Sequence, residues 1–191
     1  MDPLTCAAFL ILAFVLAGVA QTAWFRSSRS RGLAIPLDLG AKLRGRRLLG
    51  DNKTLRGFAV MLPAAAASFL LLRALASLDP VLAGRLWPLS PAAYALLGLA
   101  AGLGFMLGEL PNSFLKRQLD IPPGEAAGKR WARLVFFAVD RLDSIAGMLL
   151  AVSLLVPTSW QTWAYVALAG PPIHWSFSLA LYRLGVKKRP A

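Results

Sequence analysis

The sequence predicts an all-α integral membrane protein with five transmembrane helices, and three observations support this prediction. Of the 191 residues, 57% are hydrophobic and 16% are charged, whereas soluble domains average about 45–50% apolar and about 25% charged residues. The mean hydropathy is +0.59. The apolar residues form long continuous runs without the period of two that is typical of a half-buried strand. We expect one transmembrane domain over residues 1–191.

Five apolar runs each approach the roughly 20 residues that a helix needs to cross about 30 Å of hydrocarbon. The predicted transmembrane helices lie at about residues 3–25, 55–78, 92–110, 134–156 and 160–184. Two basic loops, at about 26–54 and 111–133, follow the first and third of them. The first run differs from a signal peptide, because its Met-Asp-Pro start has no positive charge and its apolar part exceeds the usual length of about 7–15 residues.

The basic residues predict the orientation. Of the 21 Lys and Arg residues, nine lie in 26–56, five in 116–133 and four in 183–189. Since basic segments are retained in the cytoplasm, the N-terminus is expected outside and the C-terminus inside the cytoplasmic (inner) cell membrane. This distribution explains most of the net charge of +12, so a nucleic acid polymer is not expected as a partner.

The fourth run contains three ionisable residues, Asp140, Arg141 and Asp143. At the centre of a lipid-exposed helix each costs about 2.5–3.5 kcal/mol on insertion scales, so such residues indicate a functional site. The two aspartates lie one turn apart on one helix face and provide oxygen ligands of the kind that Mg²⁺ prefers. We expect Arg141 to reach the interface or to pair with a carboxylate of a neighbouring helix. The alternative is a buried ion-pair network that only fixes helix packing.

The end of the third run adds an acid, a hydroxyl and two cations. Glu109, Ser113, Lys116 and Arg117 are spaced by four, three and one, so they share one face of a helix. Pro111 lies among them and is expected to kink the helix or to start a new turn. Glu109 is a third candidate ligand for Mg²⁺, and the two cations are candidates for binding a polyphosphate.

The segment GDNKTLRG supplies a second cationic group, with Lys53 and Arg56 beside the hydrogen-bonding residues Asn52 and Thr54. Its two glycines permit close approach of the backbone to a phosphate. The alternative interpretation is a plain topology signal. The lone Cys6 provides no disulfide framework. The lone His174 is interpreted as a packing residue, since it has no His or Cys to share a transition metal.

Five short motifs carry a resemblance to a known family. In order they are PLDLG (36–40), GRRLLGDNKTLRG (45–57), GELPNSFLKRQLDIPPG (108–124), DRLD (140–143) and YRLGVKKRP (182–190). With these motifs the sequence resembles the CDP-archaeol synthase family of membrane CTP-dependent lipid-phosphate cytidylyltransferases, related to the CDP-diacylglycerol synthases. The resemblance covers most of the chain. The family commonly has Asp where this chain has Glu109, and a small or flexible residue in place of Pro111.

The resemblance implies transfer of CMP from CTP to a membrane lipid phosphate in the bilayer, with release of pyrophosphate. It implies four roles for the site residues. Mg²⁺ is held by Asp140, Asp143 and Glu109. The triphosphate and the lipid phosphate are bound by Lys116, Arg117, Lys53 and Arg56. Hydrogen bonds come from Asn52, Thr54 and Ser113, and Asp38 orients the basic loop. The sequence leaves open whether the lipid is ether-linked or acyl, and what the oligomeric state is.

Two other functions compete with this one. The first is another membrane enzyme of lipid-phosphate metabolism, the CDP-alcohol phosphotransferase type, but the chain lacks the D-G-x-x-A-R element of those enzymes. The second is a non-enzymatic lipid or ion transporter that uses the intramembrane charges as a pathway. A transporter would leave the segments GDNKTLRG and SFLKR without a role.

Overall fold

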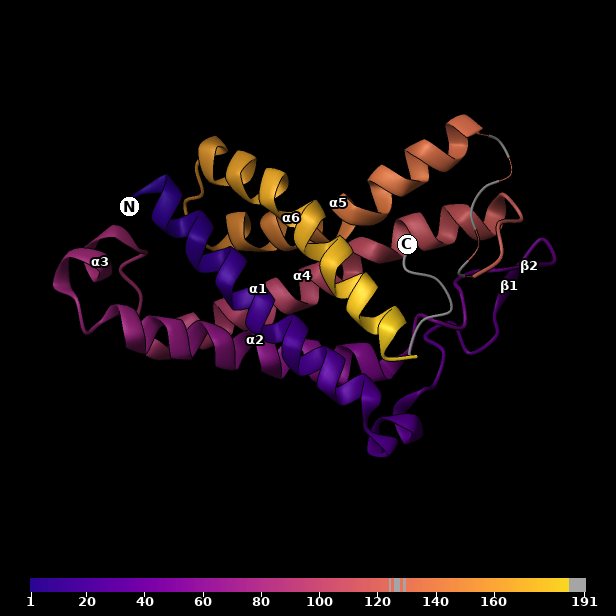
Figure 1. Ribbon diagram of the computed structural model, residues 1–191, viewed down its shortest axis with the longest axis horizontal. Coiled ribbons are helices and arrows are strands. Elements are labelled where there is room, and N and C mark those ends of the chain that lie inside the picture. The colour runs from indigo at the N-terminus through magenta and orange to yellow at the C-terminus, as the bar shows by residue number, and fades with distance from the viewer. Residues whose placement is uncertain (124, 126–127, 129, 186–191) are drawn as a thin grey trace.

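The computed structural model describes residues 1–123, 125, 128 and 130–185, which form a bundle of five long helices (Figure 1). The long helices are α1 (Pro3–Arg26), α2 (Leu55–Ala76), α4 (Pro91–Gln118), α5 (Arg130–Leu155) and α6 (Trp160–Arg183). The shorter elements are the 3-10 helix η1 (Ser28–Leu33), the antiparallel strands β1 (Lys42–Leu43) and β2 (Arg46–Arg47), and α3 (Pro80–Arg85). The basic tail residues Lys187, Lys188 and Arg189 lie outside the described residues.

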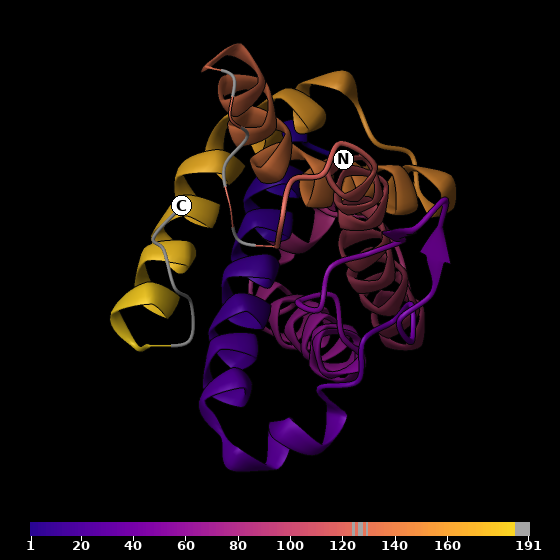
Figure 2. The same ribbon diagram turned by 90° about the vertical axis from the view of Figure 1, so that its right-hand side faces the viewer.

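The two ends of the bundle differ. The N-terminus and α3 lie at one end, and the β1–β2 hairpin and the end of α6 lie at the other (Figure 1). Figure 2 views the bundle from the hairpin end. At the opposite end, Asp2, Ser90 and Ser159 accept hydrogen bonds from backbone N–H groups in the first turns of α1, α4 and α6. Such caps satisfy otherwise unpaired donors and fix where these helices begin.

Two of the predicted boundaries and one predicted loop were wrong. Helix α4 continues through Pro111 to Gln118 instead of ending near residue 110. Residues 111–118 therefore lie on the helix, as the spacing of Glu109, Ser113, Lys116 and Arg117 indicated, and not in the predicted loop. Proline removes a single backbone donor, and the packing of α4 against its neighbours outweighs that loss. Helix α5 begins at Arg130. The first basic loop contains η1 and the hairpin, which the sequence analysis did not predict.

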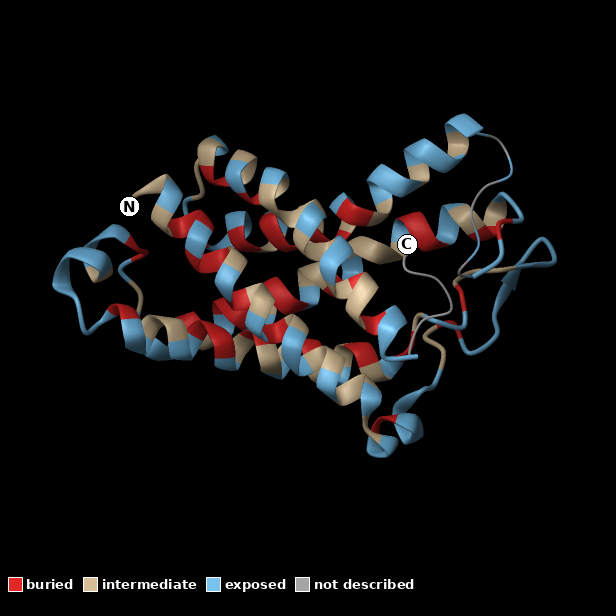
Figure 3. Cartoon of the chain, viewed as in Figure 1, coloured by how far each residue is buried: buried red, intermediate tan, exposed pale blue. Residues whose placement is uncertain are grey.

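Among the described residues, α1, α2 and α4 are long and apolar enough to cross a membrane, judged by length and composition. The ionisable residues of α5 lower its hydropathy. Large apolar side chains on the outside of the bundle are exposed, including Leu12, Val19, Leu154 and Leu168. Buried residues lie where the helices face one another (Figure 3). This distribution is typical of a bundle surrounded by lipid.

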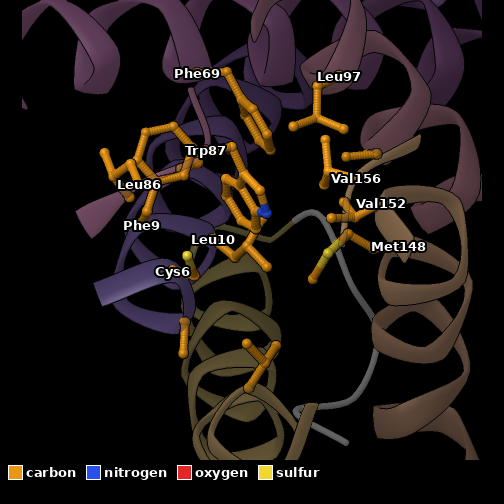
Figure 4. Packing of buried hydrophobic residues seen from close by; sticks show 14 of the residues in the cluster. Cys6, Phe9, Leu10, Phe69, Leu86, Trp87, Leu97, Met148, Val152 and Val156 are labelled. Atoms are coloured by element: carbon orange, nitrogen blue, oxygen red, sulfur yellow. The ribbon is translucent and has the colours of Figure 1, made fainter. Parts of the chain in front are cut away.

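The core of the bundle contains a cluster of aromatic side chains, in which Phe9, Phe69 and Trp87 pack together (Figure 4). The Phe9 ring lies 5.1 Å from the Phe69 ring and 6.2 Å from the Trp87 ring, both edge to face. Trp87 Nε1 donates to the Pro157 carbonyl at 2.9 Å, and the Tyr94 hydroxyl donates to the Trp87 carbonyl at 2.8 Å. The polar ends of these rings are therefore satisfied inside the core, as buried Trp and Tyr require.

Glycines bring α4 and α5 into close contact next to the polar end. Gly104 and Gly108 are four residues apart on α4 and face Gly147 of α5. A Cβ atom at Gly147 would lie 2.8 Å from Gly108 Cα, closer than packing allows. Small residues at this spacing let two membrane helices approach backbone to backbone. The next turns of α4 are thereby held against the acidic turn of α5.

Candidate active site

The contact between α4 and α5 gathers the acidic residues that the sequence singled out. Asn112 Nδ2 donates to Asp140 Oδ1 at 2.6 Å and to Asp143 Oδ2 at 2.8 Å. Lys116 Nζ binds both carboxylate oxygens of Asp140, with 2.6 Å to Oδ2. Glu109, Asn112 and Lys116 follow one another at spacings of three and four residues, so they form one face of α4. That face is directed at α5.

A second set of contacts ties this face to the loop before α2. Lys53 Nζ forms an ion pair with Glu109 Oε2. The Ser144 hydroxyl on α5 lies 3.2 Å from Glu109 Oε1 and 3.1 Å from Asp143 Oδ1. One continuous polar network results, which we call the acid–lysine network. Its members are Lys53, Glu109, Ser144, Asp143, Asn112, Asp140 and Lys116.

Two cavities flank this network. The first has a volume of about 310 Å³ and lies among α1, α2, α4, α5 and α6. Its polar wall comes from the loop before α2, the start of α2 and the middle of α4. The polar wall includes Asn52, Lys53, Thr54, Arg56 and Glu109. The other lining residues are mostly apolar, such as Phe14, Phe25, Met61, Phe105 and Phe177, with a few further polar residues, which are Gln21, Thr22, His174 and Ser178. A cationic wall beside an apolar wall suits a phosphate that carries a hydrocarbon chain.

The second cavity lies between α4 and α5 and has a volume of about 750 Å³. Asn112 and Asp143 are its polar lining residues, among side chains such as Leu115, Trp131 and Phe136. Glu109 lines the first cavity and Asp143 the second, and the Ser144 hydroxyl contacts both carboxylates. Residues of the acid–lysine network thus line both cavities.

Two arginine side chains have buried nitrogen atoms without a hydrogen-bond partner among the described residues. The Arg56 side chain stacks on the Phe25 ring at 4.6 Å, and its Nε is unsatisfied. Arg117 is 8% exposed, and its Nε and Nη1 are unsatisfied. A buried cationic donor without an acceptor is costly, so both groups are candidates for binding an anion. Only Arg56 lines one of the two cavities.

The hairpin loop is held together by Asp38. Its carboxylate accepts from Arg47 Nη2 at 2.6 Å and Nε at 3.1 Å, and from the backbone N–H groups of Leu49 and Gly40 at 2.9 and 3.1 Å. The hydrogen bonds from Arg47 lower the pKa of Asp38 to about 2. Arg46 binds Asp120 and so attaches the hairpin to the segment after α4. Asp38 therefore organises the loop instead of pointing into either cavity.

The structure brings together five of the predicted site residues in the acid–lysine network: Lys53, Glu109, Lys116, Asp140 and Asp143. Asn52, Thr54 and Arg56 join them in the wall of the first cavity. Ser113 is buried on α4, 6% exposed, and lines neither cavity. Asn112 and Ser144 were not predicted as site residues. Asn112 lies three residues after Glu109 and Ser144 directly follows Asp143, and this closeness to the predicted acids is the signal that could have indicated them.

The expectation for Arg141 was wrong. Its guanidinium carbon lies 3.3 Å from the centroid of the Phe137 ring, and its Nη1 donates to the Phe137 carbonyl at 2.6 Å. The side chain is 8% exposed and is satisfied by its own helix, one turn back. The carboxylates of DRLD are instead bound by groups from α4, so the network joins two helices.

The donor chemistry of the network fits a hard divalent cation. Carboxylates and an amide lie side by side, and the Asn112 Oδ1 atom is buried without a hydrogen-bond partner among the described residues. Oxygen ligands of these types are the ones that Mg²⁺ and similar cations prefer. In the described part of the chain, no three His, Cys, Asp or Glu side chains are grouped closely enough to hold a metal ion. Instead, Lys53 binds the Glu109 carboxylate and Lys116 binds the Asp140 carboxylate.

Fold and site together define a helical protein of the membrane-embedded type with a charged network between two cavities. The family model of the CarS-like CDP-archaeol synthases matches residues 7–190. The chain belongs to the CDP-archaeol synthase family.

Individual relatives agree with this assignment. The chain is 37% identical over 163 residues to the CDP-archaeol synthase of Halobacterium salinarum, covering 81% of this chain and 82% of the relative. It is 31% identical over 183 residues to that of Thermofilum pendens, covering 94% and 78%. It is also similar to a solved intramembrane enzyme for archaeal membrane lipids biosynthesis, with a TM-score of 0.54, 28% identity, and coverage of 87% and 90%.

Proposed function

We propose that the protein is a CTP-dependent cytidylyltransferase that transfers CMP from CTP to a membrane lipid phosphate of the archaeol type, forming CDP-archaeol and pyrophosphate. The observation that carries this proposal is the acid–lysine network, in which three carboxylates from α4 and α5 meet two lysines between two cavities. Membership of the CDP-archaeol synthase family supports it. The reaction is a step of membrane phospholipid biosynthesis.

The chemistry requires positioning more than proton transfer. An oxygen of the lipid phosphate attacks the α-phosphorus of CTP, the bond between the α-phosphorus and the bridging oxygen breaks, and pyrophosphate leaves. A phosphomonoester is already an anion at neutral pH, so no side chain has to remove a proton from the nucleophile. The protein accelerates such a step by aligning two anions and neutralising their charge.

Each cationic group has a place in this scheme. Lys53 and Arg56 lie in the wall of the amphipathic first cavity, and we assign them to the lipid phosphate, with hydrogen bonds from Asn52 and Thr54. Lys116 and Arg117 follow on α4, and we assign them to the triphosphate of CTP. Asp38 keeps the hairpin loop folded beside them. Ser113, like Lys116 and Arg117, lines neither cavity; it lies on the same helix three residues before Lys116, and we assign its hydroxyl a hydrogen bond to the triphosphate.

Mg²⁺ is the cation we propose for this site; Asp140, Asp143 and Glu109 would hold it once Glu109 and Asp140 are released from their ion pairs with Lys53 and Lys116 and move together. When bound, it supplies positive charge that neutralises the phosphate oxygens and makes the α-phosphorus more electrophilic. The three carboxylates compensate that charge, and the lysines that now bind them lie within reach of the incoming phosphates. Glu109 carries one methylene more than aspartate and is anchored by Ser144.

We further propose that all five long helices span the cytoplasmic membrane as a single domain, with the N-terminus outside and the C-terminus inside. The hairpin end carries Lys42, Arg44, Arg46 and Arg47, and basic loops are retained in the cytoplasm. In a Cys6→Ala background, a single cysteine introduced by Ala41→Cys should react with a membrane-impermeant maleimide only in inside-out vesicles. Labelling in intact cells would contradict this orientation.

The activity is tested with purified protein, CTP, Mg²⁺ and a series of lipid phosphates in mixed micelles. We expect pyrophosphate release that depends on the lipid phosphate and on the cation. The Asp143→Asn variant should insert and fold normally but lose turnover. Pyrophosphate release by this variant at the natural rate would remove Asp143 from the site, and release by no lipid phosphate would count against the function itself.

A further inference from the structure

Asn112 is a buried residue at the centre of the acid–lysine network that none of the roles above uses. It lies on α4 between Glu109 and Lys116 and is 8% exposed. Its Nδ2 group contacts one oxygen each of Asp140 and Asp143, at 2.6 and 2.8 Å. An amide NH₂ group has two diverging N–H bonds, so one side chain holds both carboxylates at a fixed spacing.

The spacing matters because the two aspartates repel each other. They lie one turn apart on α5, and like charges at this spacing are unfavourable. Lys116 neutralises Asp140, while Asp143 accepts from Asn112 and from the Ser144 backbone N–H at 2.6 Å. The neutral amide therefore keeps the two carboxylates side by side without adding a negative charge.

The other end of the amide indicates a ligand. Asn112 Oδ1 has no hydrogen-bond partner among the described residues and is inaccessible to solvent. Buried acceptors are normally satisfied, and this one belongs to a side chain that lines the second cavity together with Asp143. A carbonyl oxygen of asparagine is an accepted ligand of hard divalent cations. A cation, or a water molecule of its shell, would satisfy it.

We propose that Asn112 is part of the divalent-cation site, where its nitrogen holds Asp140 and Asp143 together and its oxygen provides a neutral ligand beside theirs. This inference rests on the proposed function, because it takes the aspartates as the cation ligands. It adds to that function a residue that sets the charge and geometry of the site.

The test measures Mn²⁺ binding directly, by electron paramagnetic resonance of free Mn²⁺ in titrations of the detergent-purified protein without CTP. Asn112→Ala should weaken Mn²⁺ binding at least about tenfold, as loss of groups that orient metal ligands commonly does. Asn112→Asp keeps an oxygen at the same place but loses the donating nitrogen and adds a negative charge, so its affinity should lie between those of Asn112→Ala and the natural protein. Gln118→Ala removes an amide from the same helix and should leave binding unchanged.

Two results would overturn the inference: Asn112→Ala binding Mn²⁺ as tightly as the natural protein, or a folded Asn112→Asp binding as weakly as Asn112→Ala. Thermal unfolding in detergent checks folding, and Asn112→Ser replaces Asn112→Ala if the latter is not obtained folded. The Asp143→Asn variant distinguishes a failure of the proposed cation site from a failure of the inference about Asn112. If it keeps Mn²⁺ binding, the cation site of the proposed function is wrong. If it loses binding while Asn112→Ala keeps it, only the inference about Asn112 is wrong.

Discussion

The ion pair between Lys53 and Glu109 provides a prediction in which stability and activity respond differently. It joins the loop before α2 to the middle of α4, and the side chains are only 18% and 22% exposed. Removing one partner of a buried pair costs about 3–5 kcal/mol, because the other charge is left uncompensated. Since about a fifth of each side chain is exposed here, we expect about 2–3 kcal/mol for Lys53→Met or Glu109→Gln alone.

The double variant Lys53→Met/Glu109→Gln leaves no unpaired charge, so it should be more stable than either single variant. Replacing both partners of a buried pair by neutral groups is often close to neutral for stability. For a protein of this size, about 2 kcal/mol corresponds to a change in Tm of about 4–8 °C. Activity should not recover with stability, because the cation assigned to the lipid phosphate is absent. We expect a loss of about 10²–10³-fold in kcat/KM, as for removal of one charge-stabilising donor.

The assay combines thermal unfolding in detergent with CTP-dependent pyrophosphate release by all four proteins. The exposed pair Arg46–Asp120, with side chains 47% and 66% exposed, is the matched control, and its double-mutant cycle should give less than about 1 kcal/mol of coupling. If the double variant were no more stable than the single ones, the pair would not be coupled. If Lys53→Met kept full activity, Lys53 would have no role in phosphate binding.

Two further predictions concern the helix contact and the hairpin loop. Gly147→Ala places a methyl group against the backbone of α4, so it should lower the free energy of unfolding by about 1–3 kcal/mol and reduce turnover. The control Gly84→Ala, where a Cβ atom has nothing within 4 Å, should change neither quantity. Equal Tm values for Gly147→Ala and the natural protein would contradict the close contact. The hydrogen bonds from Arg47 lower the pKa of Asp38 to about 2, so the folded loop favours the ionised carboxylate. The stability that Asp38 gives the loop is therefore fully present above the usual pKa of aspartate and is lost as the pH falls through about 2. Pepsin should therefore spare the loop at pH 4 and cut it near pH 2, while Asp38→Asn should be cut at both; natural protein cut equally at pH 4 would contradict this.

The sequence predicted the long helices well because continuous apolar runs determine where a membrane chain is helical. Its main error concerned the end of the third run. The helix was expected to end near residue 110 and to be followed by a loop, yet it continues through Pro111 to Gln118. Local rules describe what proline removes, whereas the packing of α4 against α5 decides whether the loss is tolerated. The hairpin was missed because strands of two residues have no periodic pattern, although Arg44 and Gly45, both with positive φ, form its turn.

The site was predictable in part. Glu109, Lys116, Asp140 and Asp143 stood out because ionisable residues are rare in apolar runs. Asn112 carries no charge and could not stand out in this way. Its importance depends on which turn of α5 faces it, and that follows from the close contact between Gly104, Gly108 and Gly147. Contacts between helices decide such roles, and one sequence does not contain them.

The central claim is that the network directs CMP, and no other part of CTP, to a lipid phosphate. It is tested most directly with CTP radiolabelled at either the α- or the γ-phosphorus, incubated with the purified protein, Mg²⁺ and an archaeol-type lipid phosphate. The claim predicts α-label in the extracted lipid, with an equal amount of γ-label released as pyrophosphate. Label from the γ-position in the lipid, or an unlabelled lipid after complete mixing, would contradict it.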